Sequence, residues 1–167
     1  MGNYRIIGID PGVNGGIASI DTYKWIKAYP DSIRLYSMPS GSREERAVRI
    51  AELIKALEPT RTIIEKVQGF HGGRSTPVTS FIMGESFGHL TGVASAVGSE
   101  LVYMTPQSWM KHLGLKKDKT KTQTEWKRSL RDYARLLFPN VEGITLKTCD
   151  ALLILKAGLD KHYEIKP

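Results

Sequence analysis

The chain has 167 residues, of which 41% are hydrophobic and 25% charged, so it can bury one substantial core but is short for two. We therefore predict one domain over residues 1–167. The formal net charge is +7, which favours an acidic partner such as nucleic acid or an anionic surface. The stretch from Lys111 to Arg131 contains eight basic and two acidic residues, so it carries +6 of this charge.

The sequence favours a reducing compartment without membrane contact. The single cysteine, Cys149, excludes an intramolecular disulfide. The N-terminus lacks a basic region followed by an apolar stretch, so no secretion signal is expected. The weakly polar stretch from Pro77 to Gly98 contains Glu85 and His89, which favours a buried helix over a membrane span. We expect a cytoplasmic protein, of a bacterium or, if the chain is viral, of the host.

The first part of the chain predicts three strands and a helix. Residues 4–10 and 16–20 are rich in β-forming residues and are separated by a Pro- and Gly-rich turn, which is typical of a hairpin. Residues 33–38 form a third candidate strand. Residues 42–45 (SREE) fit a capping box, and apolar residues at helical spacing follow it until Pro59.

The rest of the chain predicts strands that alternate with helices. In order, we expect a strand at 62–67, a Gly-rich loop at 69–73, a helix at 77–97, a strand at 100–104, a short helix from Pro106, a basic helix at 122–138 and a last helix at 148–160. This order predicts an α/β fold with a mixed five-stranded sheet, flanked by helices. Three antiparallel strands come first, and two strands that alternate with helices follow. The pattern does not predict the order of the strands.

Three carboxylates interrupt apolar elements: Asp10 ends the first strand, Glu65 follows Thr-Ile-Ile, and Asp150 precedes Ala-Leu-Leu-Ile-Leu. Because burying an unpaired ionised carboxylate is costly, a shared cation is the simplest partner. Oxygen ligands suit Mg²⁺ or Mn²⁺, and two such ions about 4 Å apart could clamp the attacking and leaving oxygens of a phosphodiester. Each acid also has a structural interpretation, as a turn initiator, an ion-pair partner on an edge strand or a first-turn helix residue respectively.

These residues resemble the motifs of RuvC-type Holliday-junction resolvases, a family with an RNase H-like nuclease fold. The motifs are GIDPG at 8–12, IIEKV at 63–67 and CDALL at 149–153, in the order of the family and at roughly its spacing. Residues 84–94 resemble the long central helix of the family, and residues 103–109 resemble the stretch that leads out of its next strand. The resemblance runs over nearly the whole chain.

The resemblance implies a structure-selective endodeoxyribonuclease that resolves four-way DNA junctions by paired symmetric nicks. It implies Mg²⁺ as the cofactor, with Mn²⁺ as a substitute and two ions in each active site. Asp10, Glu65 and Asp150 would be the metal ligands and catalytic residues. It also implies a homodimer formed through the central helix, since a junction with approximate two-fold symmetry needs two sites. The resemblance is also compatible with a helicase partner of unknown identity.

Lys147 departs from the family pattern, which usually has Asp or His three residues before the last acid. One hypothesis makes Lys147 a fourth catalytic residue that replaces part of a metal ion's charge, contacting the scissile phosphate or positioning the attacking water. The alternative is that Lys147 faces solvent or an Asp, and that Thr148 or a water completes the site. If the last helix begins early enough, a spacing of three places Lys147 on the same face as Asp150.

Two segments are candidates for DNA binding. The loop after the Glu65 strand carries Phe70, which could stack on an unpaired base, and Arg74, which could hold a phosphate. The alternative is a surface loop without such a role. The second segment would bind phosphates, because phosphate contacts dominate affinity for DNA. Its lysines are Lys116, Lys117, Lys119 and Lys121.

Other functions stay open from the sequence. A related nuclease could cut flaps, forks or RNA, and a junction-binding module with an altered Lys147 site could bind without cutting. An actin-like phosphotransferase is disfavoured, because that fold needs two such domains. The sequence contains no evident Ser/His/Asp or Cys/His set, and no pair of its histidines has zinc spacing.

Overall fold

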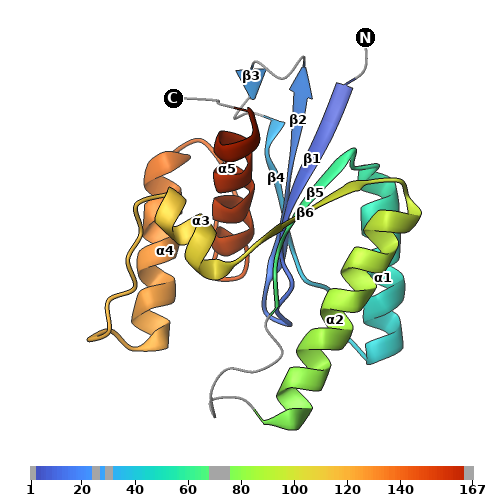
Figure 1. Cartoon of the computed structure of the whole chain (residues 1–167), viewed down its shortest axis with the longest axis horizontal. Helices are drawn as coiled ribbons and strands as arrows, with labels where there is room; N and C mark the ends of the chain where they lie inside the picture. The colour runs from blue at the N-terminus through green and yellow to red at the C-terminus, as the bar shows by residue number, and fades with distance from the viewer. Residues whose placement is uncertain (1–2, 24–26, 29–31, 68–75, 164–167) are drawn as a thin grey trace.

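A computed structural model of the chain describes residues 3–23, 27–28, 32–67 and 76–163. The strands are β1 (Asn3–Asp10), β2 (Gly16–Tyr23), β3 (Lys27–Ala28), β4 (Arg34–Ser37), β5 (Arg61–Glu65) and β6 (Glu100–Met104). The helices are α1 (Arg43–Leu57), α2 (Pro77–Ala96), α3 (Pro106–His112), α4 (Gln123–Leu137) and α5 (Cys149–Tyr163). The sheet lies between two helical layers, with α1 and α2 on one face and α3, α4 and α5 on the other (Figure 1).

The sheet confirms the predicted mixed topology. Its order is β3-β2-β1-β5-β6, and β4 also pairs with β2. Strands β1, β2, β3 and β4 pair antiparallel, whereas β5 runs parallel to both β1 and β6. All five predicted strands are present, and the two-residue β3 is an addition that the pattern did not predict. The predicted strand 62–67 is shifted, since β5 ends at Glu65.

Alternating residues of the central strands form two separate cores. Ile6 of β1 and Ile63 of β5 belong to the core beneath α5. Ile7 and Ile9 belong to the core beneath α1 and α2. Because side chains alternate along a strand, Asp10 follows Ile6 on the α5 side, and Glu65 follows Ile63 on that same side. The strand period therefore directs both acids toward the helix that carries Asp150.

The predicted starts of α1 and α4 are confirmed, and a capping box forms at each of them. The Ser42 side chain accepts a hydrogen bond from the Glu45 backbone, and the Glu45 side chain accepts one from the Ser42 backbone, completing the expected capping box. Thr122 and Glu125 form a second capping box at the start of α4. Among the described residues, no helix is both long and apolar enough to cross a membrane.

Candidate active site

Helix α5 packs directly on β1, and this close approach depends on Gly8. A Cβ atom at this position would lie 2.6 Å from the Ala151 carbonyl oxygen and 2.7 Å from the Leu155 nitrogen. A residue with a side chain here would push the helix away from the strand. The contact places the first turn of α5, which contains Asp150, at the end of β1 where Asp10 lies.

Asp10 and Glu65 end two neighbouring parallel strands. The last paired residues of β1 and β5 are Ile9 and Ile64, so the two acids follow at the same edge of the sheet. One Asp10 oxygen accepts a hydrogen bond of 3.1 Å from the Gly12 nitrogen. Asp10 therefore stabilises the turn, as its structural interpretation predicted, and its other oxygen is directed to a different partner.

That partner is Lys127 of α4, which the sequence analysis did not single out. Its Nζ atom forms an ion pair with Asp150 and lies 3.5 Å from the second Asp10 oxygen. The side chains of both acids are only 16% exposed, and that of Lys127 is 27% exposed. Burial lowers the pKa of Lys127, but the Asp150 and Asp10 carboxylates outweigh that effect, so the net shift of the pKa is upward. Lys127 therefore provides a positive charge between Asp10 and Asp150.

Trp109 fixes the third acid, Glu65. Its indole Nε1 donates a hydrogen bond of 2.7 Å to a Glu65 oxygen, and the ring is buried in the core. Burial raises the pKa of Glu65 to about 7, and the Asp10 and Asp150 carboxylates add to the shift, while the Trp109 hydrogen bond opposes it. Burial likewise raises the pKa of Asp10, against the effect of Lys127. The site is therefore short of positive charge.

Asp150 has a second neighbour in the buried Cys149, whose thiol donates a hydrogen bond of 3.3 Å to an Asp150 oxygen. Burial raises the pKa of this thiol to about 12, and the Asp150 carboxylate contributes to the shift. The cysteine therefore stays protonated and acts as a donor rather than as a nucleophile.

The charge and chemistry of these acids fit a divalent cation. Asp10, Glu65 and Asp150 supply hard carboxylate oxygens, which Mg²⁺ and Mn²⁺ prefer, and a cation would relieve the shortage of positive charge. Within the described residues, no group of three or more His, Cys, Asp or Glu side chains is close enough to hold an ion as arranged. The Lys127 ammonium lies between two of the acids instead.

An open pocket of about 720 Å³ adjoins Asp10 and Lys127, a size typical of ligand sites. Residues from the turn after β1, from α2, from the start of α4 and from the segment before α5 line this pocket. They are Gly12, Val13, Asn14, Gly15, Thr79, Met83, Gln123, Thr124, Leu146 and Lys147. Asp10 and Lys127 are therefore open to a large ligand on one side.

Lys147 lies at this pocket, but it does not share a helical face with Asp150, because the condition of an early helix start is not met. Helix α5 begins at Cys149, so Lys147 belongs to the preceding turn and its side chain is exposed. Thr148 is buried, and its hydroxyl donates a hydrogen bond of 2.7 Å to the Gly143 carbonyl. The Thr148 hydroxyl is thus committed within the turn, which weakens its case as the group that completes the site.

Known structures share this arrangement of sheet and helices. RuvC of Thermus thermophilus in complex with a Holliday junction substrate has 16% sequence identity and a TM-score of 0.63, with 94% of each chain covered. A second Thermus thermophilus RuvC structure has 16% identity and a TM-score of 0.60, with 94% of this chain and 95% of that chain covered. This chain has the RuvC fold. The resemblance predicted from the three motifs is thereby confirmed at the level of the fold.

A third solved structure is less similar to this chain. The yeast mitochondrial Holliday junction resolvase Ydc2 has 14% identity and a TM-score of 0.48, with 96% of this chain and 81% of that chain covered. No protein-family model matches the sequence, and no curated protein matches it.

Within this RuvC fold, the predicted DNA-binding lysines occupy one exposed segment between α3 and α4. Asp118 orders the segment, because one of its oxygens accepts hydrogen bonds of 2.9 Å and 2.6 Å from the Thr120 nitrogen and hydroxyl. Lys117, Lys119 and Lys121 line a hollow of about 560 Å³. Phe70 and Arg74 lie outside the described residues.

Gln123 lies between this lysine segment and the pocket beside Asp10. It lines the hollow beside the lysines and also the pocket beside Asp10. The lysine segment and the pocket that Asp10 lines are therefore parts of one continuous surface.

Lys127 is the residue that the sequence analysis missed, although a signal for it exists. Leu130 and Ala134 form the buried stripe of α4, and Lys127 precedes them by three and seven residues on the same stripe. A lysine on a buried stripe needs an acidic partner for its ammonium group. The sequence contains this signal but does not show which acids are the partners.

Proposed function

We propose that this chain is a divalent-metal-dependent endonuclease that resolves four-way DNA junctions by paired symmetric nicks. The proposal is carried by the convergence of Asp10, Glu65 and Asp150 around Lys127, beside an open pocket that Asp10 and Lys127 line. The acids come from two parallel strand ends and a helix, so rigid elements position them. The RuvC fold supports the proposal, because Thermus thermophilus RuvC with this fold has been seen with a Holliday junction substrate.

The three carboxylates would hold the metal ion, which would activate water and stabilise the leaving oxygen of the phosphodiester. The protein's own groups would prepare the site for that chemistry. Trp109 holds Glu65 in one orientation through its indole hydrogen bond. Lys127 supplies a fixed positive charge directly beside Asp10 and Asp150, where it would offset their repulsion of an approaching phosphodiester.

The surface around the pocket suits a DNA backbone. The lysine segment supplies exposed positive charge, and Gln123 adjoins both the lysine hollow and the catalytic pocket. A strand that is held through its phosphates by Lys117, Lys119 and Lys121 would thus lead toward Asp10. This arrangement favours an extended polyanion as substrate over a small molecule.

A second candidate function is binding of a junction without cleavage. The observation that favours it is the position of Lys127, which already pairs with two of the three acids. In that case the lysine would permanently replace the metal ion and the site would have no activated water.

Cleavage assays distinguish these functions. Labelled four-way junction, flap, fork and linear duplex are incubated with the protein in Mg²⁺, in Mn²⁺ or in chelator. We expect paired symmetric nicks in the junction only, and only with metal. Cutting confined to flaps or forks would indicate the related nuclease, and tight binding without cutting in either metal would indicate the binding module.

Two matched substitutions test the role of the first acid. Asp10→Asn should abolish cutting while junction binding persists, because the acid serves chemistry and the lysines supply affinity. The control is Asp132→Asn, an exposed acid on α4 that pairs with Arg131, and it should cut normally. Loss of binding in a correctly folded Asp10→Asn protein would contradict the proposed division of roles.

The same assay decides between the two interpretations of Lys147. If Lys147 contacts the scissile phosphate or positions the water, Lys147→Ala should cut far more slowly than the wild type. Lys55→Ala, an exposed lysine in the last turn of α1, is the control. An unchanged rate for Lys147→Ala would assign Lys147 to solvent.

A further inference from the structure

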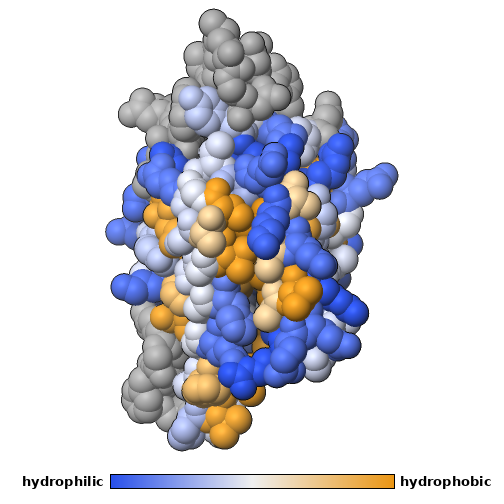
Figure 2. Space-filling model, turned by 90° about the vertical axis from the view of Figure 1, so that its right-hand side faces the viewer, coloured by the Kyte–Doolittle hydropathy of each residue, from blue (hydrophilic) through white to orange (hydrophobic). Residues whose placement is uncertain are grey.

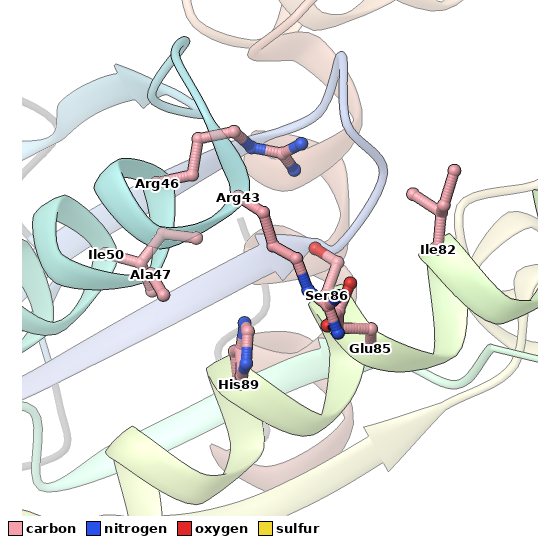
Figure 3. A pocket seen from close by; sticks show the side chains of 8 residues that line it. All are labelled: Arg43, Arg46, Ala47, Ile50, Ile82, Glu85, Ser86 and His89. Carbon is pink, nitrogen blue, oxygen red and sulfur yellow. Dashed lines mark ion pairs between the residues drawn. The ribbon is translucent and has the colours of Figure 1, made fainter.

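A narrow groove between α1 and α2 contains three basic side chains. Arg43 and Arg46 come from α1, and His89 comes from α2 together with Glu85 and Ser86 (Figure 3). The cavity within the groove is about 20 Å³, which is room for roughly one water-sized group. The groove can therefore admit a single oxygen of a ligand, but not a whole nucleotide.

The two arginines in the groove differ in their partners. Arg43 forms an ion pair with Glu85, and its guanidinium lies 5.8 Å from the centre of the Phe81 ring. The Arg46 guanidinium points away from this pair (Figure 3). Its Nε atom is buried and has no hydrogen-bond partner among the described residues, and within them Arg46 forms no ion pair. One charge in the groove is therefore neutralised and the other is not.

The buried Nε atom of Arg46 is costly to the folded protein as long as it has no acceptor. A buried donor without an acceptor loses its hydrogen bonds to water and gains nothing in return. The next arginine along the helix, Arg49, is different, since its guanidinium donates a hydrogen bond of 3.1 Å to the Ser40 carbonyl. The missing partner is therefore a specific property of Arg46 and not of every arginine on α1.

The groove borders the catalytic site through α2. The Ser86 hydroxyl donates a hydrogen bond of 2.9 Å to the carbonyl of Pro11, the residue directly after Asp10. Met83 and Thr79, one and two turns earlier on α2, line the pocket beside Asp10 itself. A polyanion in that pocket would need to extend only past α2 to reach Arg46.

We propose that Arg46 binds a backbone phosphate of the DNA strand that runs on from the active site, with a phosphate oxygen entering the groove. This proposal rests on the proposed function, because it assumes DNA in the catalytic pocket. The planar guanidinium matches the geometry of a phosphate and supplies its donors in a fixed fork. Glu85 does not repel the phosphate strongly, since Arg43 neutralises it.

The salt dependence of DNA binding tests the proposal with a matched pair, Arg46→Gln and Arg49→Gln. Both remove one positive charge from α1, so their effects on the overall charge are equal. Affinity for a four-way junction and for a linear duplex is measured in chelator over a range of salt. Loss of a phosphate contact should reduce the slope of log K against log salt by about 0.9 in Arg46→Gln. Arg49→Gln should keep the wild-type slope.

Equal slopes for Arg46→Gln and the wild type would overturn the proposal. The measurement needs no cleavage, so it is separate from the test of the proposed function. If the wild type binds DNA but never cuts, the proposed function fails, while a reduced slope in Arg46→Gln still supports the phosphate site. Should Arg46→Gln not fold, Arg46→Lys keeps the charge without the fork and should bind DNA more weakly than the wild type.

Inorganic phosphate distinguishes DNA from a free anion as the ligand. Melting temperatures are compared in phosphate and in chloride at equal ionic strength. Stabilisation by phosphate in the wild type but not in Arg46→Gln, with equal DNA slopes, would assign the groove to a free anion and overturn the DNA proposal. A weaker self-association of Arg46→Gln with unchanged DNA binding would assign Arg46 to a second copy of the chain and would also overturn it.

Discussion

Lys127 connects the electrostatics of the site with its proposed chemistry. It is the only cation that the described residues place in an ion pair with Asp10 or Asp150, and both acids are mostly buried. The three acids and Lys127 leave a net negative charge, which is consistent with the raised pKa values of Asp10 and Glu65. The site therefore contains one positive charge of its own, the Lys127 ammonium, and carboxylates that could bind a cation.

This arrangement predicts that Lys127→Met will reduce the single-turnover cutting rate by about 100-fold, the scale expected when one positioned charge is removed. Lys156→Met is the matched control, because Lys156 also pairs with an acid, Asp160, at 2.6 Å but lies outside the pocket. Junction binding should be nearly unchanged in both proteins. An unchanged cutting rate in Lys127→Met would mean that the lysine only neutralises the acids.

The raised pKa of Glu65 predicts how the stability of the metal-free protein depends on pH. In the folded state Glu65 stays protonated up to about pH 7, whereas its ordinary value is 4.5. The folded state therefore binds more protons than the unfolded state between these values, and stability falls as pH rises through them. The loss attributable to Glu65 is about 3 kcal/mol, because each pKa unit corresponds to about 1.4 kcal/mol.

Urea unfolding in chelator between pH 4.5 and 7.5 measures this loss. Glu65→Gln cannot ionise, so its stability should change less over the range than that of the wild type. Asp10 contributes in the same direction through its own raised pKa, so the variant should keep part of the slope. A wild-type stability that rises with pH over this range would contradict the prediction.

At the scale of elements, the contact between β1 and α5 assembles the site. Gly8→Ala would place its Cβ atom 2.6 Å from the Ala151 carbonyl oxygen, and backbone cannot rotate away as a flexible side chain can. We expect a loss of about 2 kcal/mol or more in the free energy of unfolding, in the upper range for overpacking. The cutting rate of the folded variant should also fall, because displacement of α5 moves Asp150. The loss of activity should therefore exceed the loss that the unfolded fraction explains.

Gly92→Ala is the control for this prediction. No atom lies within 4 Å of a Cβ built at Gly92, which is on the exposed side of α2. Alanine there should stabilise the helix slightly, since glycine is the poorer helix former by about 1 kcal/mol. Equal stability of the two variants would show that α5 adjusts freely to the larger residue.

The sequence predicted those elements whose signals are local. The capping residues Ser42 and Glu45 marked the start of α1, and the apolar runs marked the five longer strands. The two-residue β3 has no such run, because it consists only of Lys27 and Ala28. The strand order depends on which strands meet in space, and no local pattern encodes that. The start of α5 was predicted within one residue, and Lys147 precedes the helix in the prediction and in the structure.

The three acids of the site have a local signal in the sequence, whereas the role of Lys127 depends on contacts that form only on folding. Asp10, Glu65 and Asp150 were predicted because a charge that interrupts an apolar run is conspicuous. Lys127 lies in a helix with many basic residues, so only its place on the buried stripe of α4 distinguishes it. Its two partners come from β1 and α5 and become neighbours only after folding. A residue's position on a stripe is therefore readable from sequence, whereas its partners are not.

At the scale of the whole molecule, the two helical faces carry different surfaces. The basic lysine segment belongs to the layer of α3, α4 and α5. Apolar side chains gather in patches on the opposite face, which α1 and α2 form (Figure 2). The first turns of α2 contribute Val78 and Phe81, which are 67% and 65% exposed, and Ile82. Exposed apolar patches of this kind often mark interfaces.

The resemblance to RuvC resolvases predicts a dimer through α2, and this patch is where we expect a second copy to pack. Phe81→Glu should shift the protein from dimer to monomer in sedimentation experiments, because a buried unpaired charge opposes association. A monomer would present one active site to a junction, so single nicks should replace paired nicks while each site still cuts. Leu136→Glu is the control, since Leu136 is 76% exposed on α4, away from the patch. A Phe81→Glu protein that stays dimeric and nicks both strands would exclude this face as the interface.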